Sequence, residues 1–269
     1  MTHPHASPEK RLVADEGLIL RVQVGSGVHG TAISGQDDRD EMGVCLEPPR
    51  YVTGVAKPFD QYEYHTAWER AGGLRERSGA GDLDVVIYGA RKWARLAASG
   101  NPTVLLPLFV PLSEVVAIAP AGEELRANAG KFVSRVAGGR FLGYLRAQRR
   151  AMTGETGAHT NRPELVEVYG YDVKFAMHAL RLGVQGVELL STGRITLPIP
   201  EPHLSALRAV RRGERPLAEV LDRIAELDAA LEELRTTSPL PDEPDFAWIH
   251  DWLHRSYTAF WAGQGAGTR

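Results

Sequence analysis

The chain has 269 residues, of which 43% are hydrophobic and 24% charged, with a formal net charge of -3 and a single cysteine. This apolar content excludes a disordered chain and is enough for one large domain or two smaller ones. No apolar run approaches the about 20 residues that a membrane-spanning helix needs, and the polar first residues lack the apolar core of a signal peptide. We therefore expect no membrane partner. One cysteine cannot form an internal disulfide, which fits a cytoplasmic protein.

The front of the chain has the pattern of strands separated by loops. Residues 1–11 are expected to form a polar tail. The β-branched and apolar stretch Leu18–Val24 lies between glycines, which predicts a strand followed by a Gly-rich turn. Met42–Leu46 is a short apolar segment, and residues 50–80 are expected to be loop with some strand. Leu83–Tyr88 predicts a second strand.

From residue 89 onward the pattern becomes helical. Gly89–Ser99 predicts a helix, and the prolines in 104–118 predict short helical turns and a strand. Residues 121–152 are expected to be mostly helical, with a break at Gly138-Gly139. The remaining predicted helices are Asp172–Ser191, Pro216–Arg235 and Phe246–Trp261. The helix over 172–191 is expected to end at Gly193. The helix over 216–235 carries an apolar stripe that we expect to pack on the protein's own core.

The Gly-rich segment after the first strand has two interpretations. Gly25, Gly27 and Gly30 match the G-x-G-x-x-G fingerprint of dinucleotide-binding folds. That fingerprint requires an apolar-faced helix directly afterwards, whereas this chain places Gly35 and several aspartates there. The match is therefore weak, and we set the dinucleotide interpretation aside.

The second interpretation depends on aspartates. On an extended strand, Asp38 and Asp40 project from the same face, with Arg39 opposite. Two crowded carboxylates repel each other unless a cation lies between them, and hard oxygen ligands favour Mg²⁺. Asp84, on the second predicted strand, is a third carboxylate for a two-metal site. Such an aspartate-rich stretch is by itself more often a solvated loop, so the hypothesis depends on the three aspartates occurring together with a preceding Gly-Ser turn.

These residues also occur in the pattern of a known family. Eleven residues separate Ser26 from Asp38, and the order Gly-Ser, Asp-x-Asp and a distant Asp resembles the DNA polymerase β-type nucleotidyltransferase superfamily. Within it, the chain is similar to a bacterial and phage branch of predicted nucleotidyltransferases, over about residues 17–245. Further matching segments are Gly43-Val44, Tyr88, Lys92, Asn101-Pro102, Thr160–Leu165 and Gly170–Leu182.

The resemblance implies an α+β fold and a metal-dependent transfer reaction. We expect a polymerase-β-like core, a mixed sheet flanked by helices, over residues 12–120 and a mostly helical C-terminal domain over 121–262. Asp38 and Asp40 are expected to bind two Mg²⁺ ions, with Mn²⁺ as an alternative, and Asp84 to complete this metal and catalytic site. Asp84 would also orient, or help to deprotonate, the acceptor hydroxyl. Asp37 and Asp82 lie beside these candidates and are interpreted as bystanders.

The resemblance also implies residues that bind the nucleotide. Gly25 and Ser26 are expected to contact the triphosphate of an NTP. Lys174, His178 and Arg181 are spaced i, i+4 and i+7 on a predicted helix, so they share a face, either as a solvated basic stripe or as phosphate ligands. We favour the second interpretation because Thr160, Asn161, Arg162 and Tyr171 lie nearby in sequence. His178 could instead act as a proton shuttle.

The acceptor is less defined than the donor. Residues 130–150 contain a basic run without acidic residues, which is either a solvated helix face or a track for an RNA backbone. RNA, such as a tRNA end, is therefore the first choice of acceptor, ahead of a small molecule or a protein hydroxyl. A nucleotide- or RNA-binding module without turnover is the alternative from another functional class.

The chain differs from the superfamily beside the aspartate pair. Arg39 and Glu41 occur where the superfamily often has apolar residues, and they predict an exposed strand end. The oligomeric state stays open.

Overall fold

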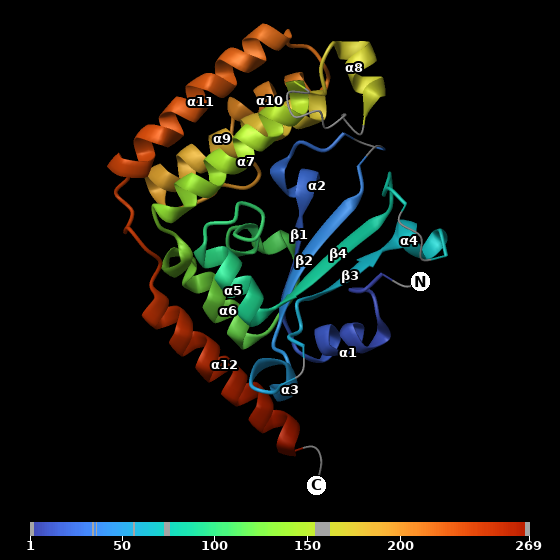
Figure 1. Cartoon of the computed structure of the whole chain (residues 1–269), viewed down its shortest axis with the longest axis vertical. Helices are drawn as coiled ribbons and strands as arrows, with labels where there is room; N and C mark the ends of the chain where they lie inside the picture. The colour runs from blue at the N-terminus through green and yellow to red at the C-terminus, as the bar shows by residue number, and fades with distance from the viewer. Residues whose placement is uncertain are drawn as a thin grey trace. The chain divides into compact units, whose positions relative to one another are not determined.

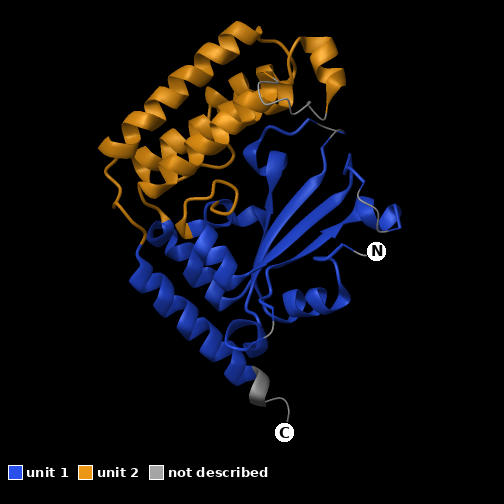
Figure 2. Ribbon diagram, viewed as in Figure 1, with its two compact units in different colours: residues 1–97, 106–132, 245–269 blue, residues 98–105, 133–244 orange. Residues whose placement is uncertain are grey.

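The computed structural model describes residues 3–33, 35, 37–55, 57–72, 76–153 and 162–266. The chain divides into two compact units, coloured separately in Figure 2. Unit 1 comprises Met1–Ala97, Leu106–Phe132 and Asp245–Arg269, and unit 2 comprises Ala98–Leu105 and Val133–Pro244. The units are therefore discontinuous along the chain, and residue 120, the predicted division, lies inside unit 1.

Unit 1 is built on a five-stranded mixed sheet with the order β3-β4-β2-β1-β5 (Figure 1). Its strands are β1 (Leu18–Val24), β2 (Arg39–Cys45), β3 (Gln61–His65), β4 (Leu83–Gly89) and β5 (Val115–Ile118). β2 and β4 are parallel, and the other three pairs are antiparallel. The two predicted strands form as β1 and β4, so the α+β fold class with a mixed sheet is confirmed.

The strand register brings four chain segments to one edge of the sheet. β1 and β3 end at this edge, whereas β2 and β4 begin there, because of their opposite directions. Val24 pairs with Asp40, Asp40 pairs with Asp84, and Asp84 pairs with His65. Residues paired across neighbouring strands share a face of the sheet. The row Val24, Asp40, Asp84 and His65 is thus set by backbone pairing.

Helix α1 (Pro8–Glu16) covers part of the sheet, where the sequence predicted a polar tail up to residue 11. Ser7 caps its N-terminus by accepting from the backbone N–H of Lys10. Its buried residues Val13 and Ala14 pack with the sheet residues Val85 and Ile87. The tail prediction failed because the apolar residues that stabilise this helix lie in its second half.

The other helices of unit 1 surround the sheet and its connections. The longer ones are α5 (Ala90–Ala98), α6 (Pro120–Ala127) and α12 (Phe246–Ala266). The shorter segments are α2 (Gly25–His29), α3 (Pro49–Val52), α4 (Thr66–Arg70), η1 (Leu106–Leu108), η2 (Leu112–Glu114) and η3 (Ala129–Phe132). Tyr257 of α12 donates to the buried carboxylate of Glu47, which also accepts from the Ala90 N–H at 3.0 Å. These bonds attach the C-terminal helix to unit 1.

Unit 2 is helical. It contains α7 (Val136–Thr153), α8 (Pro163–Tyr169), α9 (Val173–Thr192), α10 (His203–Arg211) and α11 (Leu217–Thr237), with α7, α10 and α11 packed around α9. The predicted helix over 172–191 forms as α9, with Asp172 accepting from two backbone N–H groups at its N-terminus and Gly193 left-handed at its C-terminus. The apolar stripe of α11 is buried at Val220, Ile224, Leu227 and Leu231, so its prediction as a core face is confirmed.

The predicted helix break at Gly138-Gly139 is wrong. The helical run is interrupted earlier, between η3 and α7, and both glycines lie within α7. Glycine permits close helix packing instead, because a Cβ on Gly138 would lie 3.1 Å from Leu190 Cδ1 of α9. Gly186 of α9 is similarly confined, since its Cβ would lie 2.8 Å from Phe141 Cδ1 and 2.9 Å from Leu231 Cδ2.

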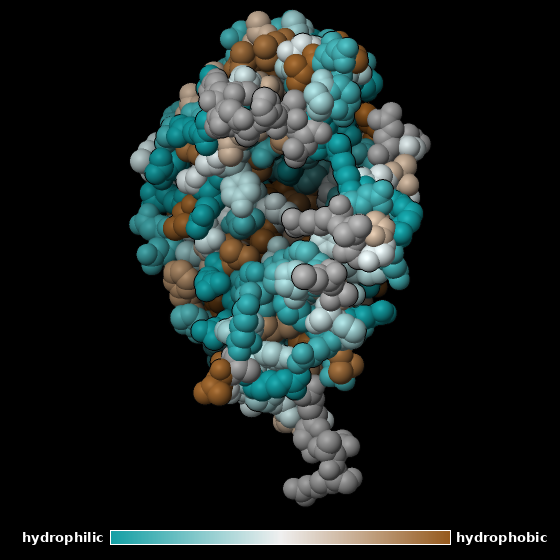
Figure 3. Space-filling view, turned by 45° about the vertical axis from the view of Figure 1, so that its right-hand side comes forward, coloured by the Kyte–Doolittle hydropathy of each residue, from teal (hydrophilic) through white to brown (hydrophobic). Residues whose placement is uncertain are grey.

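Hydrophilic side chains cover most of the face of the molecule in Figure 3, and hydrophobic ones form small separate patches. The large exposed hydrophobic residues, among them Val55, Leu112 and Val168, are scattered along the chain. Scattered residues of this kind are normal on a protein surface. Among the described helices, none is both long and apolar enough to span a bilayer.

The close packing of α9 leads to a stability prediction. Gly186→Ala should lower the free energy of unfolding, because overpacking costs about 1–3 kcal/mol and exceeds the gain of about 1 kcal/mol in helix propensity. Gly143→Ala in α7 is the matched control, because a Cβ there meets nothing within 4 Å. It should raise stability by about 0.5–1 kcal/mol. Urea unfolding of both variants checks this, and equal stabilisation by both would contradict it.

Candidate metal centre and active site

Three carboxylates meet at the sheet edge where β2 and β4 begin. Asp38, Asp40 and Asp84 each offer one oxygen atom, and these atoms all lie within 4.8 Å of one another. Asp40 and Asp84 are directly paired on parallel strands, and Asp38 precedes Asp40 by two residues. All three residues are partly buried. The structure thus brings together the three aspartates that the sequence singled out.

This group has the chemistry of a divalent metal site. Like charges so close together destabilise each other, and partial burial removes some of the water that would screen them. A cation between them reverses the sign of this interaction. Carboxylate oxygens are hard ligands, which suit Mg²⁺ and Mn²⁺. The triad therefore fits divalent metal binding.

Gly25 lies directly against the triad. Its φ is +75°, and a Cβ at this position would lie only 2.0 Å from Oδ2 of Asp40 and 2.8 Å from its Cγ. Only glycine fits there, so the backbone of the Gly-Ser segment lies against a carboxylate of the triad. The segment expected to be a turn is instead the short helix α2, which ends at Gly30 in the left-handed conformation.

The neighbours of Asp84 were not anticipated from the sequence. Ser78 Oγ donates to Asp84 Oδ1 at 2.7 Å, and His65 Nδ1 lies 3.0 Å from the same oxygen. The imidazole of His65 stacks on the indole of Trp68, with ring centroids 3.7 Å apart. These residues come from a stretch interpreted as loop with some strand. The available signal was the alternating pattern of residues 61–65, which is typical of a short strand.

The two neighbouring aspartates have structural partners. Asp37 accepts a hydrogen bond from the backbone N–H of Ile33 at 2.7 Å. Asp82 accepts from both terminal nitrogens of Arg70, at 2.8 and 3.2 Å, and from the Gly79 N–H. The hydrogen bond from Arg70 is the main cause that lowers the pKa of Asp82. These contacts give both carboxylates a structural role apart from the triad.

The expectation of an exposed strand end holds for Arg39 but not for Glu41. The Glu41 side chain is buried and lies on the opposite face from Asp40. It accepts from Arg21 Nε at 2.5 Å and from Arg39 Nε at 2.8 Å. The two guanidinium groups compensate the buried charge, which explains why an acidic residue occurs at a position that is often apolar.

In unit 2, Lys174, His178 and Arg181 lie along α9 and are partly buried. Burial lowers the pKa of His178 well below its usual value, and the positive charges of Arg181, Lys174, Arg211 and Arg162 lower it further. Burial also lowers the pKa of Arg181 to about 10. Five basic residues from three segments of unit 2 therefore gather around one face of α9, which makes this face attractive to an anion.

The other residues expected near this basic face are only partly described. Thr160 and Asn161 lie outside the described residues. Arg162 lies over the ring of Phe175, with its guanidinium carbon 5.3 Å from the centroid, and 3.5 Å from a carboxylate oxygen of Asp172. Tyr171 donates its hydroxyl to the backbone oxygen of Arg215 at 2.7 Å, so its polar group has a structural partner.

Three of the six basic residues in the run over 130–150 form ion pairs with acidic residues that are distant in sequence. Lys131 Nζ lies 2.9 Å from Asp245. Arg146 binds Asp228 at 2.7 Å and Glu232 at 3.0 Å. The remaining pair is Arg135 with Asp242 at 2.7 Å. The run is therefore not a continuous track of uncompensated charge. Arg149 and Arg150, together with Arg146, line a hollow between α7 and α11.

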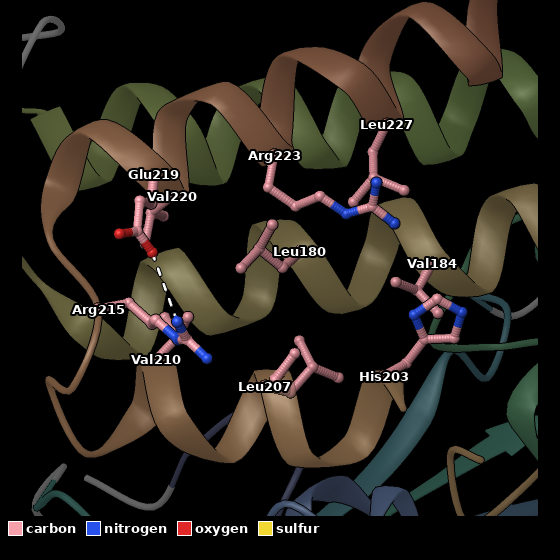
Figure 4. A pocket seen from close by; sticks show the side chains of 11 residues that line it. Leu180, Val184, His203, Leu207, Val210, Arg215, Glu219, Val220, Arg223 and Leu227 are labelled. Atoms are coloured by element: carbon pink, nitrogen blue, oxygen red, sulfur yellow. Dashed lines mark ion pairs between the residues drawn. The ribbon is translucent and has the colours of Figure 1, made fainter. Parts of the chain in front are cut away.

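Unit 2 also contains an apolar cavity of about 210 Å³ between α9, α10 and α11 (Figure 4). Leu180, Leu207 and Leu227 are among the aliphatic residues that line it. Its acidic lining residue, Glu219, forms an ion pair with Arg215 at 3.5 Å, drawn as the dashed line. One paired carboxylate does not make a divalent metal site, so this cavity is chemically unlike the triad.

The fold and the triad define a class of protein. A mixed sheet with three clustered aspartates at its edge, after a Gly-Ser segment, is the arrangement of the polymerase-β-like nucleotidyltransferases. The chain matches the model of the RNA repair pathway DNA polymerase beta family (RlaP) over residues 8–255. It therefore belongs to this family, as the motif pattern indicated.

No curated protein matches the chain. Among solved structures, it matches a nucleotidyltransferase-like protein from Exiguobacterium sibiricum, with 13% sequence identity and a TM-score of 0.29. This match covers 84% of the present chain and 73% of the other.

The contact between Gly25 and Asp40 predicts a specific loss of metal binding. Gly25→Ala should weaken Mn²⁺ binding by about 10- to 100-fold, because the new Cβ must displace the Asp40 carboxylate. Gly27→Ala is the control, since its Cβ would meet only the flexible end of Gln23. Electron paramagnetic resonance titration with Mn²⁺ measures both affinities. Equal affinities in the two variants would exclude the proposed constraint.

The lowered pKa of His178 predicts a pH-dependent stability. Because the unfolded chain binds a proton more readily than the folded one, stability is lost as the pH falls below about 6.5. His178→Gln should remove this loss, which amounts to at most about 1.4 kcal/mol per pH unit. Urea unfolding between pH 7.5 and 5.5 tests it, with His254→Gln at an exposed position as control. An unchanged pH dependence in His178→Gln would refute the assignment.

Proposed function

We propose that this protein is a Mg²⁺-dependent nucleotidyltransferase that transfers a nucleoside monophosphate from an NTP to a hydroxyl group of RNA and releases pyrophosphate. The observation that carries the proposal is the aspartate triad at the sheet edge, with the backbone of Gly25 against Asp40. RNA is favoured as acceptor because the description of the family names an RNA repair pathway.

The metal-binding roles follow from the carboxylate geometry. Asp38 and Asp40 would hold both ions, and Asp84 would complete the site. When bound, two divalent ions stabilise the charge that develops on the attacking and leaving oxygens of a phosphoryl transfer. Gly25 and Ser26 would contact the triphosphate, because the backbone of Gly25 lies against Asp40.

Asp84 is the carboxylate for the acceptor side. It lies on the opposite side of Asp40 from the Gly-Ser segment in the order of the strands. Its carboxylate would accept a hydrogen bond from the acceptor hydroxyl and help to remove the proton as the new P–O bond forms. Ser78 and His65 contact one of its oxygens and would keep the carboxylate oriented.

Lys174, His178 and Arg181 would neutralise the charge of the departing pyrophosphate. The gathering of basic side chains around His178 on α9 supports the assignment, because such side chains attract phosphate groups. The lowered pKa of His178 means that this imidazole is neutral at pH 7 in the free protein. An anion bound there would raise that pKa, so His178 could both bind phosphate and take up a proton.

The alternatives differ in acceptor or in turnover. The same chemistry on a small molecule or a protein hydroxyl remains the second choice. A binding module without activity would have no use for an intact triad, and all three carboxylates are present.

Transfer activity is the direct test. Purified protein with Mg²⁺ and each α-³²P-labelled NTP should label a band in total cellular RNA. Asp38→Asn/Asp40→Asn and Asp84→Asn should lower the rate by at least about 10²-fold, because they remove charges that hold the metal ions. Asp37→Asn is the matched control, since this neighbouring carboxylate accepts a backbone hydrogen bond that an amide oxygen can also accept.

The labelling experiment has three possible outcomes. Label in RNA that depends on the triad supports the proposal and identifies the nucleotide. Binding of NTP with Mg²⁺ but no labelled RNA moves the acceptor to another class or favours the binding module. If no NTP binds with any metal ion, the proposal is wrong.

A further inference from the structure

A second feature of the sheet edge is a cavity of about 370 Å³ next to Asp84. It lies within unit 1, beside the end of β3 and the start of α4. Its lining residues are His65, Trp68, Glu76, Arg77, Ser78 and Asp84. The cavity thus combines one carboxylate of the triad with two aromatic rings and a basic side chain.

The aromatic side of this cavity is held by several contacts. His65 and Trp68 are stacked with an interplanar angle of 30°, and the ring of His3 lies 4.6 Å from that of Trp68 at a tilt of 50°. His65 is also attached to the triad through Asp84. Both His65 and Trp68 line the cavity, so the pair forms a fixed aromatic wall against which a flat ring can pack.

The charged residues of the cavity differ in their availability. Glu76 lies 3.9 Å from Arg70, which compensates part of its charge. Arg77 is exposed on the rim. A guanidinium group beside an aromatic pair suits a ligand that joins a planar base to a phosphate.

The order of strands decides which substrate fits here. In spatial order across this edge of the sheet, Gly25-Ser26 after β1 comes first and Asp40 on β2 lies next to it. Asp84 on β4 follows, and His65 at the end of β3 comes last. Phosphoryl transfer proceeds in line, so the leaving and attacking oxygens lie on opposite sides of the phosphorus. A triphosphate held at Gly25-Ser26 therefore requires the acceptor to approach from the side of Asp84 and His65.

We propose that this cavity binds the 3′-terminal nucleoside of an RNA acceptor, with the base stacked on the His65–Trp68 pair and a ribose hydroxyl at Asp84. This inference rests on the proposed function, and it adds where the acceptor binds and through which group. Arg77 contacts the phosphate that precedes this nucleoside. Stacking recognises any base, so the site selects for a nucleoside end rather than for a sequence.

The test compares two RNA oligonucleotides that differ only in whether the 3′-terminal nucleotide carries a base. Loss of that base should raise the acceptor KM of the wild-type protein roughly 5- to 150-fold, the range expected for one stacked base. Trp68→Ala should raise the KM for the intact acceptor by a similar factor and should be insensitive to the missing base. Trp68→Phe, which keeps a ring, should recover most of the loss.

Controls separate stacking from a structural role. Phe246→Ala removes an exposed aromatic residue elsewhere in unit 1 and should leave both acceptors unaffected. Mn²⁺ affinity should be equal in wild type and Trp68→Ala, which shows that the triad is intact. A purely structural effect of Trp68 would weaken the two acceptors by the same factor, whereas stacking weakens only the one with the base.

The outcomes distinguish this inference from the proposed function. If the wild type transfers label but the missing base costs the same in wild type and Trp68→Ala, the cavity assignment is wrong and the function stands. Equilibrium binding of the two oligonucleotides without NTP judges the cavity even if no transfer occurs. The assignment is supported if the wild-type protein binds the oligonucleotide with the terminal base more tightly than the one without it, and if Trp68→Ala loses this difference. Equal binding of the two oligonucleotides by the wild type, or no binding, overturns the assignment.

Discussion

The parallel pairing of β2 with β4 is the constraint on which the candidate site depends. It places Asp40 and Asp84 at the same level of the sheet, where their charges repel each other in the absence of a cation. The register is imposed from the interior, because Met42 and Val44 of β2 and Val85 and Ile87 of β4 are buried. On β4, a slip by one residue would move Val85 and Ile87 to the opposite face, where Val86 and Tyr88 are only partly buried. Hydrophobic packing therefore holds together carboxylates that would otherwise separate.

The sequence was sufficient for the members of the triad but not for their neighbours. Asp38 and Asp40 follow from the two-residue period of a strand, and Asp84 from its place on a second strand. The aromatic and hydroxyl groups around Asp84 could not be foreseen, because β3 has only five residues and its pairing with β4 is a long-range contact. The approach of Gly25 to Asp40 likewise depends on the antiparallel register of β1 and β2, which no local pattern encodes.

The basic run shows how a local pattern leaves out charge partners that only the fold supplies. Residues 130–150 contain no acidic residue, yet Arg146 pairs with a carboxylate 82 positions later and Lys131 with one 114 positions later. Both partners come from segments that pack nearby only after folding. By contrast, the spacing of Lys174, His178 and Arg181 was informative, because residues four and seven apart on one helix share a face whatever the tertiary structure is.

The arrangement of the sheet edge separates two tasks. The triad lies on two central strands, whose position is fixed by neighbours on both sides. Two of the groups proposed to contact substrate lie on short helical segments at the ends of the flanking strands: Gly25-Ser26 on α2 after β1 for the triphosphate, and Trp68 on α4 after β3 for the acceptor. Two side chains of α4 hold the start of β4, since Thr66 hydrogen-bonds to Leu83 and Arg70 to Asp82. On the proposed assignments, a change at Trp68 would therefore alter the acceptor site with less effect on Asp84 than a change at either of these residues. On the proposed assignments, the β3–α4 end of the sheet, rather than the triad, would define the substrate of this chain.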